Sequence, residues 1–396
     1  MAHVERVSVE GFKTIAELSV EPGQFTVVTG RNNSGKTSLL EAVRLGCEPE
    51  TVDKVRSFDS KSWIDMMINR QQTASIVEIT AGDTTETVRL RPPSNHQAMM
   101  AAAREGARLM QAKDTVDSRI LDFVSNHIPQ SGDWVNQSIR ILETDEESYP
   151  VINDPQIGPR AAGAFVYRLR SEHGVDPIDE SKLELVDDPV AGSKLIEPSG
   201  AIYRPDLFHE SVPESHVPTK FVTHGTTVDV DDDDPVKMDD IGDFLREKGI
   251  LEDLKTFTLD DLIFDPDDGE KYAVPFDQMG EGFRAIVALL WELLDDDLPE
   301  VVFLEEPTTH MHPGYVREVV YFLIQLAMEE DVQLFVTTHS NDFLNDLFAE
   351  NLHEEEVAFL EEDFKLFQMQ DGGAKTLDYR EAEHSLTELY NDLRGI

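Results

Sequence analysis

Residues 30–37 read Gly-Arg-Asn-Asn-Ser-Gly-Lys-Thr, an octapeptide that fits the pattern G-x-x-x-x-G-K-[ST]. This pattern constrains the fold strongly, because such a loop works only between a strand and the helix that follows it. Residues 25–29 form a short β-branched run typical of a strand, and residues 38–45 have the apolar spacing of a helix. A glycine- and asparagine-rich turn that fits by chance is the alternative, and both flanking elements argue against it. The sequence therefore predicts an α/β fold with a phosphate-binding loop.

The chemistry of the loop explains its spacing. Gly30 and Gly35 let the backbone wrap closely around a phosphate chain, and the N–H groups at the start of the next helix favour an anion. Lys36 places a full positive charge on the β- and γ-phosphates of a nucleotide, and Thr37 offers a hydroxyl to Mg²⁺. The candidate nucleotide-binding residues are Gly30, Arg31, Asn32, Asn33, Ser34, Gly35, Lys36, Thr37 and Ser38.

The charge of the chain is strongly negative, with 34 basic against 79 acidic residues and a net charge of −45. The acid is spread along the whole sequence, and such self-repulsion is tolerated where salt screens it, with a Debye length of about 3 Å near 1 M. We infer a halophilic cytoplasmic protein of archaeal type, and an ordinary acidic protein is the alternative. Any contact with DNA then needs a local basic patch. The single cysteine, Cys47, suits a reducing compartment, and we expect neither a membrane span nor a signal peptide.

The pattern along the chain predicts a P-loop NTPase head built from residues 1–60 and 236–396, with an α+β lobe inserted at residues 61–235. We expect strands that form a mixed, largely parallel core sheet flanked by helices. The expected strands lie at residues 4–9, 15–20, 25–29, 76–80, 86–90, 273–276, 300–304, 332–337, 357–360 and 365–369, with another around residue 263. The expected helices lie at residues 38–45, 96–127, 238–251, 282–294, 315–329 and 379–393, with a short one after residue 341.

A second candidate element follows the apolar run at residues 301–304, which ends in Glu305 and Glu306. A parallel strand carries such acids to the carboxyl edge of the sheet, beside the phosphate-binding loop. Glu305 is then placed to hold Mg²⁺, and Glu306 is placed to orient and polarise the attacking water. In a chain this acidic, two surface carboxylates are the alternative. The four apolar residues before the pair, with Pro307 and Thr308 after it, favour the catalytic interpretation.

Four ordered motifs resemble the ABC-type ATPases of the OLD/RecF/SMC-like group. The turn ending at Lys13 resembles the group's opening Gly/Asn-Phe-Arg/Lys turn, and residues 30–37 match its Walker A loop. Glu-Glu-Pro-Thr-Thr-His-Met-His-Pro at 305–313 resembles Asp-Glu-Pro-Glu-x-His-Leu-His-Pro, and Thr-His-Ser at 338–340 resembles its switch. In addition to these four, Met-Gly-Glu-Gly-Phe-Arg at 279–284 stands where the group carries its signature loop. The resemblance covers about residues 1–60 and 236–396.

The resemblance implies an ATP-hydrolysing homodimer with Mg²⁺ that sandwiches two ATP molecules. Gly280 and Gly282 of one chain would then contact the γ-phosphate bound by Lys36 of the other, and His339 would sense that phosphate. The chain departs from the group at Gly280, which replaces a serine, at Glu305, which replaces an aspartate, and at Thr308, which replaces a frequent glutamate. These departures leave the hydrolysis rate open. A metal site at His310 and His312 is the less favoured interpretation, and Gln71 and Gln72 are candidates for the Q-loop by position only.

Three functions follow from the resemblance. The first is an ATPase in DNA repair or anti-phage defence that acts with DNA or an effector protein. The second is a slow nucleotide switch that controls a partner toxin or nuclease, and the third, which the missing full signature disfavours, is a transporter subunit. The 56 residues after Ser340 are too few for the Toprim nuclease domain of OLD proteins. Candidate DNA contacts, with solvated helix faces as the alternative, are Lys54, Arg56, Lys61, Arg70, Arg104, Arg108, Lys113 and Arg119.

Overall fold

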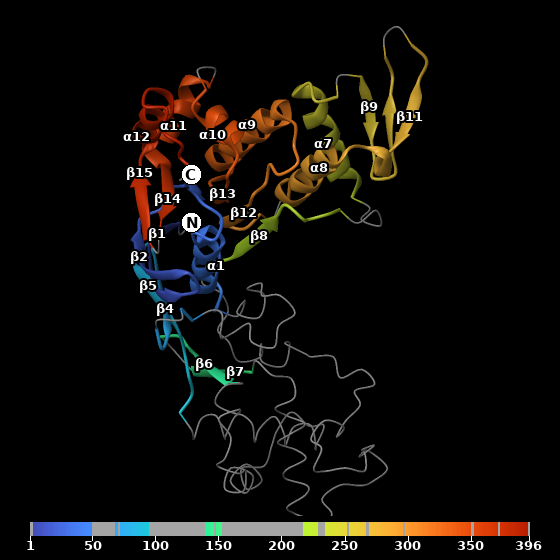
Figure 1. Ribbon diagram of the computed structural model, residues 1–396. Helices are drawn as coiled ribbons and strands as arrows, with labels where there is room; N and C mark the ends of the chain where they lie inside the picture. Colours follow the sequence, from blue (N-terminus) through green and yellow to red (C-terminus); the bar gives the residue numbers. More distant parts are fainter. Residues whose placement is uncertain are drawn as a thin grey trace, which may run out of the picture.

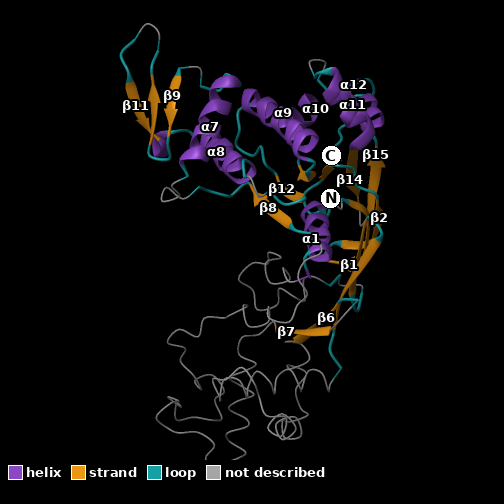
Figure 2. Ribbon diagram, turned by 180° about the vertical axis from the view of Figure 1, so that it is seen from behind, coloured by secondary structure: helices purple, strands orange, loops and turns teal. Residues whose placement is uncertain are grey.

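The computed structural model describes residues 3–49, 68–69, 72–94, 139–145, 148–152, 217–228, 234–251, 253–266, 269–295, 298–349, 352–370 and 373–394. These residues form two six-stranded sheets and one three-stranded sheet. One helix lies between the two larger sheets, and most of the other helices cover the far face of the core sheet (Figures 1 and 2). The expected mixed α/β fold is confirmed.

The core sheet has the strand order β15-β14-β3-β13-β12-β8. Its first five strands in chain order run parallel to their neighbours, and β15 closes one edge antiparallel to β14. The central strands are apolar and buried on both faces, as parallel sheets require. Their bounds are β3 (Phe25–Gly30), β8 (Thr219–Thr223), β12 (Val301–Glu305), β13 (Gln333–Thr337), β14 (Phe364–Gln370) and β15 (Gly373–Leu377).

The second large sheet is antiparallel, with the order β2-β1-β4-β5-β6-β7. Helix α1 (Lys36–Cys47) packs between this sheet and the core sheet, in one buried cluster with residues of both. Gln333 links the two sheets, because its buried amide accepts from Val4 N at 2.8 Å and donates to Val4 O at 2.9 Å. The strand bounds are β1 (Val4–Phe12), β2 (Ile15–Val20), β4 (Ser75–Ala81), β5 (Thr84–Arg91), β6 (Ile139–Glu143) and β7 (Ser148–Ile152).

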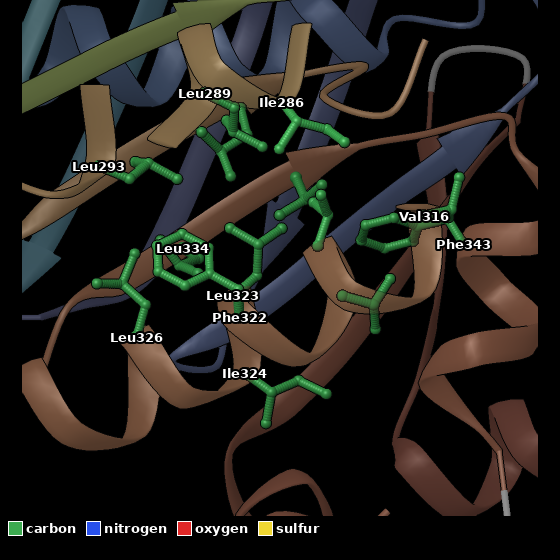
Figure 3. Close-up of a cluster of buried hydrophobic side chains, with 14 of the residues drawn as sticks. Ile286, Leu289, Leu293, Val316, Phe322, Leu323, Ile324, Leu326, Leu334 and Phe343 are labelled. Atoms are coloured by element: carbon green, nitrogen blue, oxygen red, sulfur yellow. The ribbon is translucent and has the colours of Figure 1, made fainter. Parts of the chain in front are cut away.

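The other face of the core sheet is covered by helices. Figure 3 shows where α8 and α9 meet it: Leu289 and Leu323 lie in the same buried cluster as Leu334 of β13. The helix bounds are α7 (Pro235–Glu247), α8 (Glu281–Leu293), α9 (Pro313–Glu330), α10 (Asn341–Leu347), α11 (Glu354–Asp363) and α12 (Tyr379–Thr387). The small antiparallel sheet beside α7 comprises β9 (Leu254–Phe257), β10 (Asp261–Phe264) and β11 (Tyr272–Pro275), and the 3₁₀ turn Phe276–Gln278 follows it. Of the helices in the described ranges, none is long and apolar enough to cross a membrane.

The structure corrects some expected elements. Residues 357–360, expected as a strand, lie inside helix α11, and the last helix ends at Thr387 instead of residue 393. The helix expected at 238–251 begins earlier, at Pro235, and ends at Glu247. The helix expected at residues 96–127 lies outside the described residues.

The range expected as an inserted lobe, residues 61–235, contributes strands to the head. Strands β4 and β5 extend the antiparallel sheet from β1, and β8 pairs in parallel with β12 at the edge of the core sheet. These three strands therefore belong to the head, because strand pairing follows register and not order along the chain. Much of the range lies outside the described residues.

Candidate active site

The loop between β3 and α1 has the backbone that its glycines were expected to provide. Gly30 has a φ of 140° and Gly35 a φ of 104°, both in a region that side-chain-bearing residues rarely adopt. A Cβ added at Gly30 would lie 2.6 Å from Ser34 Oγ and 2.8 Å from Met369 O. The loop therefore closes tightly on itself and on β14.

The polar side chains of the loop fit a phosphate chain. Lys36 is 8% exposed, and its Nζ donates to Gly30 O at 3.0 Å and to Arg31 O at 3.3 Å. The Lys36 amine thus donates to two neutral backbone carbonyls of its own loop, and an anion can replace them as acceptor. Ser34 Oγ is buried without a hydrogen-bond partner, which a phosphate oxygen would supply. These residues fit a nucleotide phosphate.

A hydroxyl and a carboxylate from separate elements meet at the edge of the core sheet. Thr37 Oγ1, in the first turn of α1, donates to Glu305 Oε1 at the end of β12 over 2.5 Å. Both groups are hard oxygen ligands of the kind that a divalent cation prefers. The longer glutamate, which replaces the aspartate of the related motif, reaches the hydroxyl directly. The pair fits a cation that would also contact a nucleotide phosphate.

Behind this pair, Glu41 is 5% exposed and forms an ion pair with Lys13. Burial raises the pKa of the Glu41 carboxyl, Lys13 opposes that shift, and the charge of Glu305 adds to it. Lys13 comes from the turn of the first hairpin and stands in a left-handed conformation with φ 50°. Its carbonyl accepts a hydrogen bond from Asn69 Nδ2 at 3.0 Å. The contact between Lys13 and Glu41 was not foreseen from the sequence, which has no local signal for a pairing 28 residues apart.

Glu306 and His339, which the sequence predicts as the second acid and the switch histidine, are in direct contact. Glu306 Oε1 lies 2.7 Å from His339 Nδ1, and Glu306 Oε2 accepts from His339 N at 3.1 Å. The backbone of Glu306 is left-handed, with φ 51°, and its N–H donates to Thr337 O and Thr337 Oγ1, each at 3.1 Å. The last residue of β13, Thr337, therefore holds the backbone of Glu306, and His339, two residues beyond the strand, holds its carboxylate.

The two glycines of the expected signature loop have different surroundings. Gly280 is the N-cap of α8, makes no side-chain cap hydrogen bond, and has open space where a Cβ would stand. Gly282 packs against the chain, because an added Cβ would lie 2.7 Å from His310 O. Close packing alone therefore accounts for glycine at 282, whereas Gly280 faces open space.

His312 has a structural role, because its ring accepts from Gly314 N at 3.1 Å and caps α9. In the described parts of the chain, no group of three or more His, Cys, Asp or Glu side chains forms a metal site. Gln72 is exposed, whereas Gln71 lies outside the described residues. The candidate DNA contacts also lie outside them: Lys54, Arg56, Lys61, Arg70, Arg104, Arg108, Lys113 and Arg119.

Comparisons with known proteins give two family matches. The family described as "AAA domain, putative AbiEii toxin, Type IV TA system" matches residues 116–345, and a second, described as "AAA domain", matches residues 6–153. No curated protein matches the sequence.

Similar solved structures include the SMC head domain from Thermotoga maritima, at 11% identity and a TM-score of 0.42, covering 95% of this chain and 98% of that one. An Smc head domain with an extended coiled coil, bound to the C-terminal domain of ScpA and derived from Pyrococcus furiosus, shares 11% identity at a TM-score of 0.44, covering 99% and 100%. The recombination mediator protein RecF-ATPrS shares 12% identity at a TM-score of 0.34, covering 95% and 98%.

Proposed function

The chain belongs to the AAA-domain family matched by residues 116–345 and is an ATP-binding ATPase, and we propose that two copies hydrolyse ATP with Mg²⁺ in sites that they share. The observation that carries this proposal is the meeting of two pairs at one edge of the core sheet. Thr37 contacts Glu305, and Glu306 contacts His339. One pair fits a cation on the phosphates and the other fits the attacking water.

Each residue has a role in this scheme. Lys36 would leave the carbonyls of its own loop and bind the β- and γ-phosphates, while Thr37 and Glu305 would hold Mg²⁺. Mg²⁺ held there would neutralise charge that develops on the phosphates. Glu306 aligns the attacking water, and His339 holds the Glu306 carboxylate in place. Positioning and charge stabilisation then account for most of the rate.

The second half of each site comes from another copy in this proposal. Gly280, with open space beside it and no side chain to cap α8, would present backbone N–H groups to the γ-phosphate of the partner's ATP. Gly282 would keep α8 close to the loop after Glu306. The opening and closing of the dimer would then be coupled to hydrolysis.

The test is the variant Glu306→Gln, measured by light scattering with and without saturating ATP and Mg²⁺ in molar salt. We expect ATP to trap the variant as a dimer, because it binds nucleotide but hydrolyses it slowly. The matched control is Glu306→Gln combined with Lys36→Ala, which should stay monomeric. A Glu306→Gln protein that binds ATP and remains a monomer would refute the shared site.

For biological role, we propose DNA maintenance or anti-phage defence with DNA or an effector protein as partner. The description of the matched family names a toxin of a toxin–antitoxin system, which supports defence. The check is turnover with duplex, single-stranded and broken-end DNA in molar salt, and unchanged turnover with all three argues against DNA as the partner.

The alternative is a slow ATP-dependent switch that controls a toxin or nuclease. Two features favour low basal turnover. The Glu306 carboxylate is already held by both the ring and the backbone N–H of His339, and Gly280 lacks the serine hydroxyl of the related motif. Turnover well above about 1 s⁻¹ in the isolated protein would count against this second role.

A further inference from the structure

The strand that leads into the phosphate-binding loop is attached to a segment far away in the sequence, residues 389–394. In this segment Leu393 is buried, at 2% exposed, whereas residues 389–392 are exposed. The carbonyl of Leu393 accepts two hydrogen bonds, from Thr29 Oγ1 at 2.7 Å and from Gln368 Nε2 at 2.9 Å. Thr29 directly precedes Gly30 on β3, and Gln368 lies on β14. One carbonyl therefore joins the ends of two core strands.

The two donors are themselves buried and lie side by side. Thr29 is 0% exposed and Gln368 is 9% exposed, and the two residues pair in the parallel ladder between β3 and β14. Paired residues of neighbouring strands place their side chains on the same face of a sheet, so the hydroxyl and the amide can reach the same carbonyl. A buried donor without an acceptor is destabilising, and the Leu393 carbonyl supplies the acceptor for both.

The strand ends that this carbonyl joins also shape the phosphate-binding loop. The next pair in the ladder is Met369 and Gly30. A Cβ added at Gly30 would lie 2.8 Å from Met369 O, and one added at Gly35 would lie 3.5 Å from Met369 Cε. Gly30 O in turn accepts from Lys36 Nζ at 3.0 Å. A shift of β14 against β3 would therefore displace the loop and the Lys36 amine together.

The segment is built so that it can detach without unfolding the head. Asn391 holds it to the end of α12, because its N–H donates to Ser385 O at 2.9 Å and its Nδ2 donates to Ser385 Oγ at 3.1 Å. Leu389 is 56% exposed and Tyr390 is 88% exposed, and Tyr390 has a left-handed backbone with φ 53°. One buried side chain, exposed flanks and a strained residue are the properties of a part that opens locally.

We propose that residues 389–394 form a clamp whose closed state favours the binding of ATP. In the closed clamp, Leu393 O holds Thr29 and Gln368 together and so positions the phosphate-binding loop. These three are positioning residues and do not contact the nucleotide. By thermodynamic linkage, bound nucleotide stabilises the closed clamp by the same factor by which the clamp raises nucleotide affinity. The clamp rests on the proposed binding of the ATP phosphates by Lys36 and its loop.

The first test compares Thr29→Val with Thr26→Val by chemical denaturation and by binding of a non-hydrolysable ATP analogue with Mg²⁺ in molar salt. Thr26 is the matched control, because it lies on the same strand, is also 0% exposed, and has a hydroxyl that donates to Gly23 O at 3.0 Å. We expect similar losses of stability in both variants. Only Thr29→Val should raise the Kd of the analogue, by about 5- to 10-fold, the effect of one buried hydrogen bond.

Two further readouts distinguish positioning from a general structural effect. Thr29→Ser keeps the hydroxyl and should bind the analogue within about twofold of the parent. In steady-state hydrolysis, Thr29→Val should raise KM while kcat stays within about twofold, because the groups proposed to act on the attacking water are untouched.

A second variant removes the buried side chain of the clamp instead of the hydroxyl. Leu393→Ala should weaken analogue binding by up to about tenfold, whereas Leu389→Ala, on the exposed part of the same segment, should stay within about 1.5-fold of the parent. If Thr29→Val does not fold, this pair decides the question.

Hydrogen exchange measures the same linkage from the side of the clamp. The saturating analogue should slow exchange of the Asn391 amide about 5- to 10-fold in the parent, and should have little effect in Thr29→Val. Equal exchange with and without the analogue in the parent would refute the clamp.

The outcomes separate the clamp from the proposed site. If Lys36→Ala abolishes analogue binding but Thr29→Val binds as tightly as the parent, only the clamp is refuted. Equal losses of affinity in Thr29→Val and Thr26→Val would also refute it, because general destabilisation would then explain both. If Lys36→Ala binds the analogue as tightly as the parent, the proposed phosphate-binding site itself fails.

Discussion

The contact between Glu306 and His339 allows a quantitative prediction about hydrolysis. Replacing Glu306 by Gln removes a general base, which contributes about 10²- to 10⁴-fold to a rate. Replacing His339 by Ala removes one hydrogen bond to the carboxylate and leaves the second, from the backbone N–H of His339. A hydrogen bond to a charged group contributes about 1.5–3 kcal/mol. The His339 side chain is 59% exposed, so solvent screening reduces this to about 1 kcal/mol.

About 1 kcal/mol corresponds to an approximately fivefold loss of kcat in His339→Ala. Because the ring is proposed to act through the carboxylate, the same substitution should change the rate of Glu306→Gln by less than about twofold. The coupling energy of the double-mutant cycle is then about 1 kcal/mol. The assay is single-turnover hydrolysis of γ-labelled ATP with protein in excess, which detects the slow rate of the glutamine variant.

An additive cycle would refute this reasoning. If His339→Ala costs a further fivefold in the Glu306→Gln background, the ring acts directly on the phosphate instead of through Glu306. The matched control is the exposed pair of His384 and Glu388, whose Nδ1 and Oε2 atoms lie 3.0 Å apart on the last helix. Substitutions of these two residues should leave single-turnover rates within about 1.5-fold of the parent.

Three further substitutions test the packing and charge of the fold. Gly282→Ala should lower the free energy of unfolding, measured by chemical denaturation, by up to about 2 kcal/mol. A Cβ 2.7 Å from His310 O costs about 1–3 kcal/mol, and the higher helix propensity of alanine offsets up to about 1 kcal/mol of that cost. An unchanged free energy would contradict the close packing. Gln333→Met keeps the side-chain length but leaves the buried backbone N–H and C=O of Val4 unpaired, so calorimetry should show a free energy of unfolding lower by about 2–4 kcal/mol. An unchanged free energy would contradict this link between the two sheets. Burial raises the pKa of Asp346 from 3.8 to about 6, so the native state binds this proton more tightly than the unfolded state and loses stability as pH rises from about 4 to 6. Asp346→Asn should therefore raise the melting temperature at pH 7.5 but not near pH 3.5, and an equal rise at both would contradict the shift.

Local patterns predicted the elements that carry their own signals. The strands ending at Gly30 and Glu305 and the helix beginning at Lys36 were expected at nearly their observed positions, because apolar runs and glycine loops are local features. The prediction of a strand at residues 357–360 was wrong, because four consecutive apolar or small residues resemble a buried strand. The stronger signal lay just before them, where Glu356 completes a capping box with His353 and starts helix α11.

Long-range pairing could not be predicted in the same way. Each residue of strand β8 lies 82 positions before the residue of β12 with which it pairs, and the five residues of β8 carry no pattern that indicates this partner. Likewise, the glycine at 282 was explained from the sequence by a ligand, whereas the structure supplies a packing reason in the carbonyl of His310.

The backbone after β12 shows that strand pairing, and not the motif residues alone, determines the geometry of the site. Glu306 has a φ of 51° and His310 a φ of 68°, conformations that cost a residue with a Cβ about 1–2 kcal/mol each. Glu306 keeps this conformation because its N–H is held by the carbonyl and hydroxyl of Thr337. The same turn brings its carboxylate back toward His339. Since Thr337 ends β13 and His339 follows it two residues later, the orientation of the acid depends on the register between β12 and β13. A shift of either strand by one residue would turn Glu306 to the opposite face, although every residue of the motif would remain.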